Sequence, residues 1–248
     1  MISPDHGGPS GTTLTIDAAG AAPPNLRKCQ LIEVLVFLFL IVPSLVLSFL
    51  SPQQLKAGFN LVAWGTIFRD LSLVCLLAYL LWRNGEPMTR LGWQARDISK
   101  EVAIGLLLFF PLLAGTSFLE QYLRTIGFSG QPKSLGGFLT PQSAPQFALA
   151  FLLVLVVAVT EETIFRGYLI LRFEFLTRSR IAAALLSSAI FSVGHGYEGT
   201  AGVATVGVLG LAFAAVYLWR RSLVAPIVMH FMQDFIAIVA IPLAAHHH

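Results

Sequence analysis

The acidic pair Glu161 and Glu162 stands in an apolar part of the chain, within "AVTEETIFRGYLI", residues 158–170. The segment "FALAFLLVLVV" comes directly before it, so both carboxylates fall inside a predicted membrane span. Ionised groups at the centre of such a span cost roughly 2.5–3.5 kcal/mol each, and they persist where they pair, line a water-filled cavity or do chemistry. A carboxylate in this place could act as a general base or as a metal ligand.

Helical spacing separates the two acids. Glu162 and Arg166 are i,i+4 neighbours, so they share a helix face and can pair. Glu161 is rotated from Glu162 by about 100° and points in another direction. We assign Glu162 and Arg166 to a supporting role, in which they fix the helix or reach a substrate carboxylate. We expect Glu161 to face a cavity.

The histidines are scarce. His195 and His230 are the only ones apart from those at the two ends of the chain, and both lie in predicted spans. His230 is four residues before Asp234 in "HFMQD", and Phe191 has the same spacing to His195 in "FSVGH". From a rise of about 1.5 Å per residue, Glu161, His195 and His230 lie roughly 16, 22 and 12 Å deep. The acid and both imidazoles are therefore expected to converge near the middle of the bilayer.

The composition predicts a membrane protein. Of the 248 residues, 56% are hydrophobic and 12% are charged, and the mean hydropathy is +0.75. Soluble domains carry about 25% charged residues, so this chain is predicted to be an all-α, polytopic membrane helix bundle. The net charge of +3 does not indicate nucleic-acid binding, because no basic face accompanies it. Cys29 and Cys75 show no metal-ligand spacing.

Seven apolar segments are near the length of about 20 residues that a transmembrane helix needs. They are residues 30–50, 60–82, 101–119, 146–172, 180–198, 201–219 and 222–243. Most lysines and arginines then fall on the side of the amino terminus, and only Lys56, Arg124 and Lys133 fall on the other. This bias predicts a cytoplasmic amino terminus and an external carboxyl terminus, and we expect a bacterial cytoplasmic membrane.

The chain divides simply. Residues 1–25 are rich in Gly, Pro, Ser and Thr and are predicted to be a disordered tail. Residues 26–245 form a single transmembrane domain, with the catalytic core at about 146–243. The final residues 246–248 are interpreted as the remnant of an affinity tag. Arg69 and Asp70 interrupt the second span, and we interpret them as charges that partner other helices.

Three motifs in the second half of the chain resemble those of the CPBP family. This family includes CAAX prenyl endopeptidases and bacteriocin-processing or self-immunity proteins. Its pattern is EExxxR, FxxxH and HxxxB, with B being Asn or Asp, and all three occur here in order. They read Glu161-Glu162-Thr-Ile-Phe-Arg166, Phe191-Ser-Val-Gly-His195 and His230-Phe-Met-Gln-Asp234. The resemblance implies intramembrane hydrolysis of a peptide bond, in a membrane-associated or C-terminally lipidated peptide or protein.

The resemblance also implies roles for the site residues, with Glu161 as the catalytic glutamate. In a metal-free mechanism, Glu161 and His195 activate a water, His230 stabilises the oxyanion and Asp234 orients His230. In a metal mechanism, Glu161, His195, His230 and Asp234 are zinc ligands and a zinc-bound water attacks. The expected cofactor is therefore either none or zinc. We favour the metal-free glutamate mechanism.

Non-catalytic functions are the alternative. The same buried polar cluster could serve a membrane scaffold, an immunity factor or a carrier. Carriers often show inverted repeats and paired broken helices, and the sequence shows neither. We therefore favour an intramembrane protease whose partners are membrane lipids and a peptide or membrane-protein substrate, with no nucleic acid.

Overall fold

The computed structural model describes residues 24–49, 58–94, 97–130 and 140–246, and these contain helices but no strands. The helices are α1 (Pro24–Ser48), α3 (Phe59–Arg83), η1 (Met88–Leu91), α4 (Ile98–Thr125), α5 (Ala144–Glu161), η3 (Glu162–Leu169), α6 (Ile170–Thr177), α7 (Arg180–Val193), η4 (Gly196–Glu198), α8 (Gly199–Arg220), α9 (Val224–Asp234), η5 (Phe235–Ala240) and α10 (Ile241–His246). The predicted disordered tail lies outside the described residues, except that Pro24 and Asn25 begin α1.

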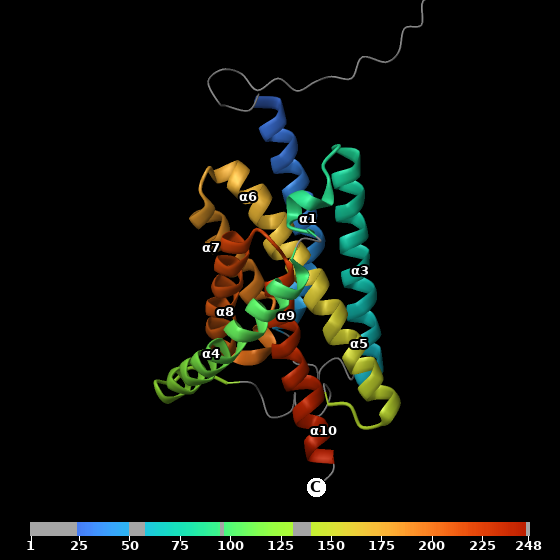
Figure 1. Cartoon of the computed structure of the whole chain (residues 1–248), viewed down its shortest axis with the longest axis vertical. Coiled ribbons are helices and arrows are strands. Elements are labelled where there is room, and N and C mark those ends of the chain that lie inside the picture. Colours follow the sequence, from blue (N-terminus) through green and yellow to red (C-terminus); the bar gives the residue numbers. More distant parts are fainter. Residues whose placement is uncertain (1–23, 50–57, 95–96, 131–139, 247–248) are drawn as a thin grey trace, which may run out of the picture.

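The predicted all-α bundle of about seven helices is confirmed. Six helices in the described ranges are long and apolar enough to cross a membrane. The exception is the span predicted at residues 180–198, because α7 has only 14 residues and ends at Val193. His195 therefore lies in a turn beyond α7. The prediction that it lies within the helix is wrong. The first helix begins at one end of the bundle and α10 finishes at the other (Figure 1).

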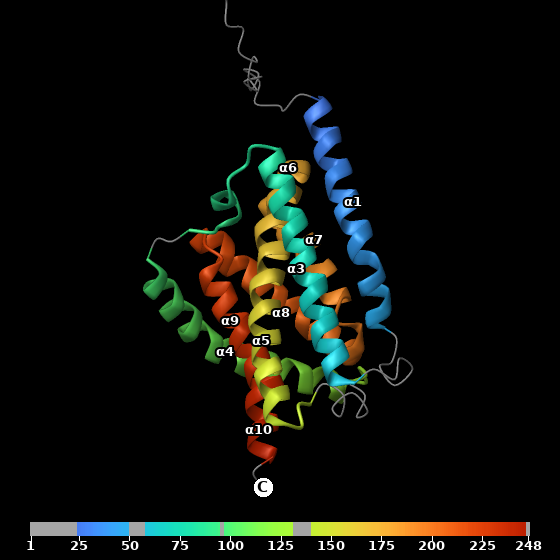
Figure 2. The same cartoon turned by 90° about the vertical axis from the view of Figure 1, so that its right-hand side faces the viewer.

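One long, continuous helical segment, the central rod, lies in the middle of the bundle. α5, η3 and α6 continue into one another as a single helical segment of 34 residues, Ala144–Thr177. α3 packs against α5, α1 packs against α6, and the α7–α8 pair lies beside η3 (Figures 1 and 2). α4 runs aslant across the bundle and packs on α8 and α9. The rod therefore contacts every helix that carries a motif residue.

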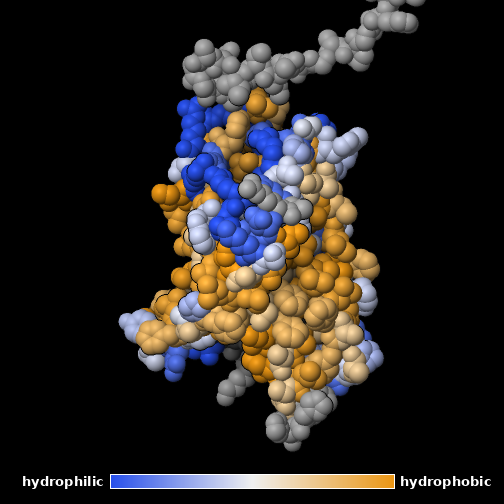
Figure 3. Space-filling model, viewed as in Figure 1, coloured by the Kyte–Doolittle hydropathy of each residue, from blue (hydrophilic) through white to orange (hydrophobic). Residues whose placement is uncertain are grey.

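The outer surface is apolar. On the face that Figure 3 draws, a broad hydrophobic belt separates a large group of hydrophilic residues at the end where α1 begins from smaller groups toward the other end. Large apolar side chains are exposed on several helices, including Phe39 on α1, Trp82 on α3 and Leu107 on α4. A surface of this kind is stable when lipid is the solvent. Together with the six long apolar helices, it identifies an integral membrane protein.

Local sequence explains where several helices begin and end. The side chain of Ser179 caps α7 by accepting a hydrogen bond from the backbone N–H of Ala182 at 3.2 Å. Pro145 lies in the first turn of α5, where its missing N–H has no cost. α6 and α8 are each followed by a residue in the left-handed conformation, Arg178 and Arg221. These caps set the short connections to α7 and α9.

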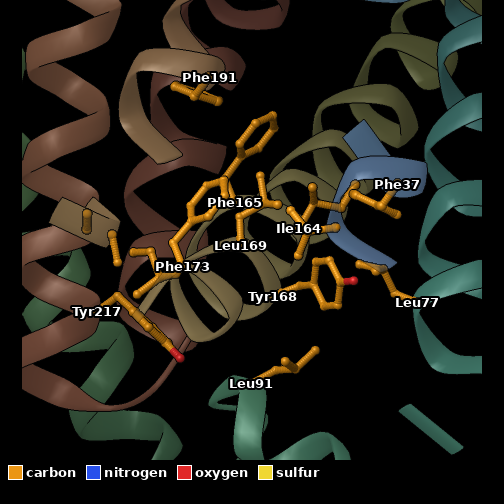
Figure 4. Close-up of a cluster of buried hydrophobic side chains, with 14 of the residues drawn as sticks. Phe37, Leu77, Leu91, Ile164, Phe165, Tyr168, Leu169, Phe173, Phe191 and Tyr217 are labelled. Carbon is orange, nitrogen blue, oxygen red and sulfur yellow. The ribbon is translucent and has the colours of Figure 1, made fainter. Parts of the chain in front are cut away.

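The largest core cluster surrounds η3. Phe165, Tyr168 and Leu169 of η3 are buried at its centre (Figure 4). Around them lie Phe37 of α1, Leu77 of α3, Leu91 of η1, Phe191 of α7 and Tyr217 of α8. Packing from five other elements therefore immobilises the helical segment that follows Glu161.

A buried ionic cluster fixes one end of the rod. Arg172 of α6 has 1% of its side chain exposed and pairs with Glu33 at 3.0 Å and with Glu86 at 2.9 Å. The hydroxyl of Tyr168 donates to Glu33 at 2.8 Å. The cluster joins α1, the segment after α3 and the central rod. Its charges are paired, as buried charges must be.

Close packing between α4 and α9 leads to a prediction. A Cβ added at Gly105 would lie 2.8 Å from the carbonyl oxygen of Ala225 and 2.8 Å from Cβ of Val228. Gly105→Ala is therefore expected to push α9 from α4 and to lower the free energy of unfolding by about 1–3 kcal/mol. Gly115→Ala on the same helix is the control, because nothing lies within 4 Å of its added Cβ. Unfolding in detergent measures both, and equal stability of the two variants would contradict the close approach.

Candidate active site

The two acids occupy a junction between helix types. Glu161 is the last residue of α5, and Glu162 begins η3, a π-helix of 8 residues. π-helical turns are rare and are frequent at functional sites. The Nη1 group of Arg166 donates to Oε1 of Glu162 at 2.8 Å, which confirms the pairing predicted from the spacing. The acid pair thus begins a wider helical turn that keeps Glu162 and Arg166 on one face.

Arg166 is enclosed by protein. Its side chain is 1% exposed, and its guanidinium lies over the ring of Phe191 at 4.3 Å and that of Phe213 at 5.1 Å. Its Nη2 group donates to the carbonyl oxygen of Gly210 at 3.4 Å. This environment fits the predicted role in fixing the helix. It does not fit the alternative role of reaching a substrate carboxylate.

His230 of α9 lies between the two acids. Its Nδ1 is 2.7 Å from Oε1 of Glu162, and because a carboxylate oxygen accepts, Nδ1–H is the donor. Its Nε2 is 3.5 Å from Oδ2 of Asp234 and 3.9 Å from Oε2 of Glu161. The imidazole is 4% exposed. Asp234 was the predicted orienting partner, but Glu162 makes the shorter contact, so Glu162 holds both Arg166 and His230.

His195 follows α7 in the turn before η4. Its Nδ1 is 3.0 Å from the carbonyl oxygen of Phe191. A carbonyl can only accept, so Nδ1 carries the hydrogen and Nε2 of the neutral ring keeps its lone pair. The ring of Phe191 packs against both imidazoles, with centroids 4.7 Å from His195 and 5.9 Å from His230. His195 also interacts electrostatically with Glu161.

The structure thus gathers the four predicted catalytic residues from three places in the bundle. Glu161 comes from the end of α5, His195 from the α7–η4 turn, and His230 with Asp234 from α9. The side chains of Glu161 and Asp234 are 16% and 26% exposed, while Glu162 is fully buried. The less buried acids are therefore those that face Nε2 of His230.

Three further residues that sequence reasoning did not assign to the site lie close to it. Asp70 of α3 is 2% exposed, pairs with Arg69 at 2.8 Å and lies 3.3 Å from the hydroxyl of Thr160. Both Arg69 and Asp70 interact electrostatically with Glu161. The ring of Tyr197 lies 5.8 Å from that of His195. The interruption of an apolar span by Arg69 and Asp70 was the available indication for the first two.

A cavity of about 490 Å³ adjoins the turn that carries His195. Its walls are mostly small or apolar residues that come from just after α1, from the segment after α4, from the end of α7 and the turn that follows it, and from α8. They are Phe49, Ser129, Ser192, Gly196, Gly199, Thr200, Val203, Ala204 and Gly207. The cavity therefore has room for an apolar group beside the site.

The predicted zinc ligands do not form a metal site as these side chains stand. Among the described residues, no group of three or more His, Cys, Asp or Glu side chains is placed to hold a metal ion. Nδ1 of His230 is bound to Glu162 and Nδ1 of His195 to a backbone carbonyl. These contacts leave Nε2 of both rings as the atoms that a metal could take, but among the described residues the acids and imidazoles are not gathered around one point.

The fold and site together define a polytopic helical membrane protein with a buried acid–imidazole cluster. Residues 143–236 match the family model described as type II CAAX prenyl endopeptidase Rce1-like. The matched segment contains all three motifs, and the match supports the predicted resemblance to the CPBP/CAAX protease family. No curated protein and no solved structure matches the chain.

Proposed function

We propose that the protein is an intramembrane endopeptidase that hydrolyses a peptide bond in a membrane-associated or C-terminally lipidated substrate. The observation that carries this proposal is the hydrogen bonding of one carboxylate oxygen of Glu161. Its Oε2 is buried and has no hydrogen-bond partner among the described residues, although it lies 3.9 Å from Nε2 of His230. Buried acceptors are nearly always paired, so this oxygen is suited to bind the attacking water.

Activation of the water falls to Glu161 and His195. The neutral His195 ring offers the Nε2 lone pair as an acceptor for one hydrogen of the water. Glu161 accepts the other hydrogen and takes that proton as the water oxygen bonds to the carbonyl carbon of the substrate. When the carbon–nitrogen bond breaks, the proton returns from Glu161 to the leaving nitrogen. Atoms and charges then balance, and Glu161 is ionised again.

Stabilisation of the oxyanion falls to His230. Carboxylate oxygens of Glu162, Asp234 and Glu161 lie 2.7, 3.5 and 3.9 Å from its ring nitrogens, and in the proposed mechanism the ring carries a hydrogen on both nitrogens. Because Nδ1–H is bound to Glu162 and this contact holds the ring in place, Nε2–H is the donor left for the developing oxyanion. A fixed donor at that point stabilises the charge as it forms. The apolar cavity beside His195 would take an apolar group of the substrate.

Asp234 distinguishes the two mechanisms. In the metal-free mechanism, Asp234→Asn keeps a polar partner 3.5 Å from Nε2 of His230 and adds an amide donor. We therefore expect cleavage by this variant to stay within about 10-fold of wild type. A zinc-ligand role predicts a much larger loss, because a neutral amide is a poor substitute for a carboxylate ligand. Cleavage rates and the zinc content of both purified proteins check the prediction.

The proposed activity is tested with purified protein in lipid vesicles. A prenylated peptide ending in a CAAX sequence is incubated with it in ¹⁸O-labelled water, and the products are weighed by mass spectrometry. Hydrolysis places one ¹⁸O in the new carboxyl group. Cleavage that survives dialysis against a chelator eliminates the metal mechanism. An intact peptide in the presence of folded protein, with no peptide in the host changing length upon Glu161→Ala, overturns the proposal.

We also propose an orientation in the membrane. The amino end of α1 faces the cytoplasm and the end of α10 faces outward, in a bacterial cytoplasmic membrane. The excess of basic residues on the amino-terminal side supports this orientation. Glu161 would then lie at about mid-depth in the bilayer, where it could act on a peptide bond that soluble proteases do not reach.

A further inference from the structure

Arg69 has an unusual place for a charged residue. It lies ten residues along α3 from Phe59, or about 15 Å from that end of the helix. Its side chain is 41% exposed. A guanidinium that faced lipid at this depth would be costly, and such groups face the bundle interior or a water-filled cavity instead. The exposed part of Arg69 is therefore expected to line the site.

Asp70 holds the guanidinium of Arg69 in place but does not occupy all of its hydrogen-bond donors. Its Nε group donates to Oδ1 of Asp70 at 2.8 Å, and its Nη2 lies 2.8 Å from the same oxygen in an ion pair. A guanidinium has five N–H donors. Among the described residues, Asp70 is the one acceptor that Arg69 contacts. Asp70 is itself buried against Thr160. The pair thus holds the arginine in place and leaves N–H groups for a further acceptor.

Arg69 is close to the reacting groups. Thr160, which contacts Asp70, is the residue before Glu161. Arg69 and Arg166 both interact electrostatically with Glu161. Arg166 is enclosed between two phenylalanine rings, so Arg69 is the one of this pair that a bound molecule can reach.

We infer that Arg69 binds the C-terminal carboxylate of the substrate while the scissile bond lies at Glu161. The inference rests on the proposed function, because a tail cut near its end carries a free carboxylate into the membrane. That charge needs a partner there as much as any side chain does. A planar guanidinium matches a carboxylate in geometry and charge. The three residues that follow the cysteine of a CAAX tail span at most about 10 Å when extended. The long side chain of Arg69 helps to bridge this distance between the scissile bond and the C-terminal carboxylate.

The test compares two peptides and two proteins. One prenylated CAAX peptide without Asp or Glu is made with a free C-terminal carboxylate and as its C-terminal amide. Wild type is expected to cleave the amide with kcat/KM lower by about 10- to 100-fold, the range of a hydrogen bond between charged groups. Arg69→Gln is expected to cleave both peptides equally, at a rate near that of wild type on the amide. Arg69→Lys should retain part of the preference.

A matched control and two outcomes complete the test. Arg180→Gln removes another exposed arginine, which begins α7 and pairs with Glu174 of α6 at 2.7 Å, and should keep the wild-type preference. If wild type cleaves acid and amide equally, or if Arg69→Gln lowers both rates by the same factor, the inference is overturned and Arg69 is structural. If wild type cleaves neither peptide and no host peptide changes length upon Glu161→Ala, the proposed function itself fails.

Discussion

Replacing Glu161 by glutamine is expected to lower kcat for peptide cleavage by about 10²- to 10⁴-fold, the usual contribution of a general base. The amide has nearly the same shape as the carboxylate but cannot take a proton from water. The side chain is 16% exposed, its Oε2 has no hydrogen-bond partner among the described residues, and it is not an ion-pair partner of Arg166. The loss should therefore be in catalysis, with little change in stability.

Peptide binding separates this loss from misfolding. Glu161→Gln should bind the peptide with a dissociation constant close to that of wild type and hold it uncut, which binding of a fluorescent peptide measures. Glu120→Gln is a control at an exposed glutamate paired with Arg124 outside the site, and it should leave cleavage unchanged. Residual cleavage by Glu161→Gln within 10-fold of wild type would remove Glu161 from the role of base.

The second large effect is expected at Glu162. Its Oε1 holds Nη1 of Arg166 at 2.8 Å and Nδ1 of His230 at 2.7 Å, and the side chain is fully buried. Glu162→Gln leaves a buried arginine without its counter-charge, which costs about 3–5 kcal/mol of unfolding free energy. It also removes the anion that orients His230, so cleavage should fall by about 10²-fold or more. Thermal unfolding in detergent and cleavage rates measure the two effects.

A double variant separates the two roles of Glu162. In Glu162→Gln/Arg166→Met the uncompensated charge is gone, and apolar contacts with Phe191 and Phe213 can remain. Most of the lost stability should return, because replacing both partners of a buried pair is far less costly than removing one. Cleavage should stay low, since His230 still lacks its carboxylate. A double variant that regains both stability and activity would show that Glu162 serves Arg166 alone.

The sequence was sufficient for those features that follow from helical spacing and membrane cost. The scarcity of charge in an apolar chain pointed to Glu161, His195, His230 and Asp234. The pairing of Glu162 with Arg166 followed from i,i+4 spacing, which places the two side chains on one face in α- and π-helical turns alike. The apolar segments likewise predicted the helices, because lipid permits few other structures.

Other features depend on tertiary packing that spacing does not encode. Nothing in the residues shows that Glu162–Leu169 forms a π-helix or that α7 ends before His195. The contact between Glu162 and His230 joins residues 68 apart in sequence. The proximity of Arg69 to Glu161 depends on how α3 lies against α5. A charged pair in an apolar span indicates an interior position, but it does not say which interior group it meets.

The short length of α7 bears on how water reaches the site. A helix of 14 residues extends about 21 Å, less than the hydrocarbon thickness of about 30 Å. Lipids beside such a helix shorten the local bilayer, or polar headgroups follow its end inward. Hydrophobic mismatch at α7 would then bring the aqueous phase toward His195. The length of the lipid acyl chains would in that case control how readily the attacking water reaches the site.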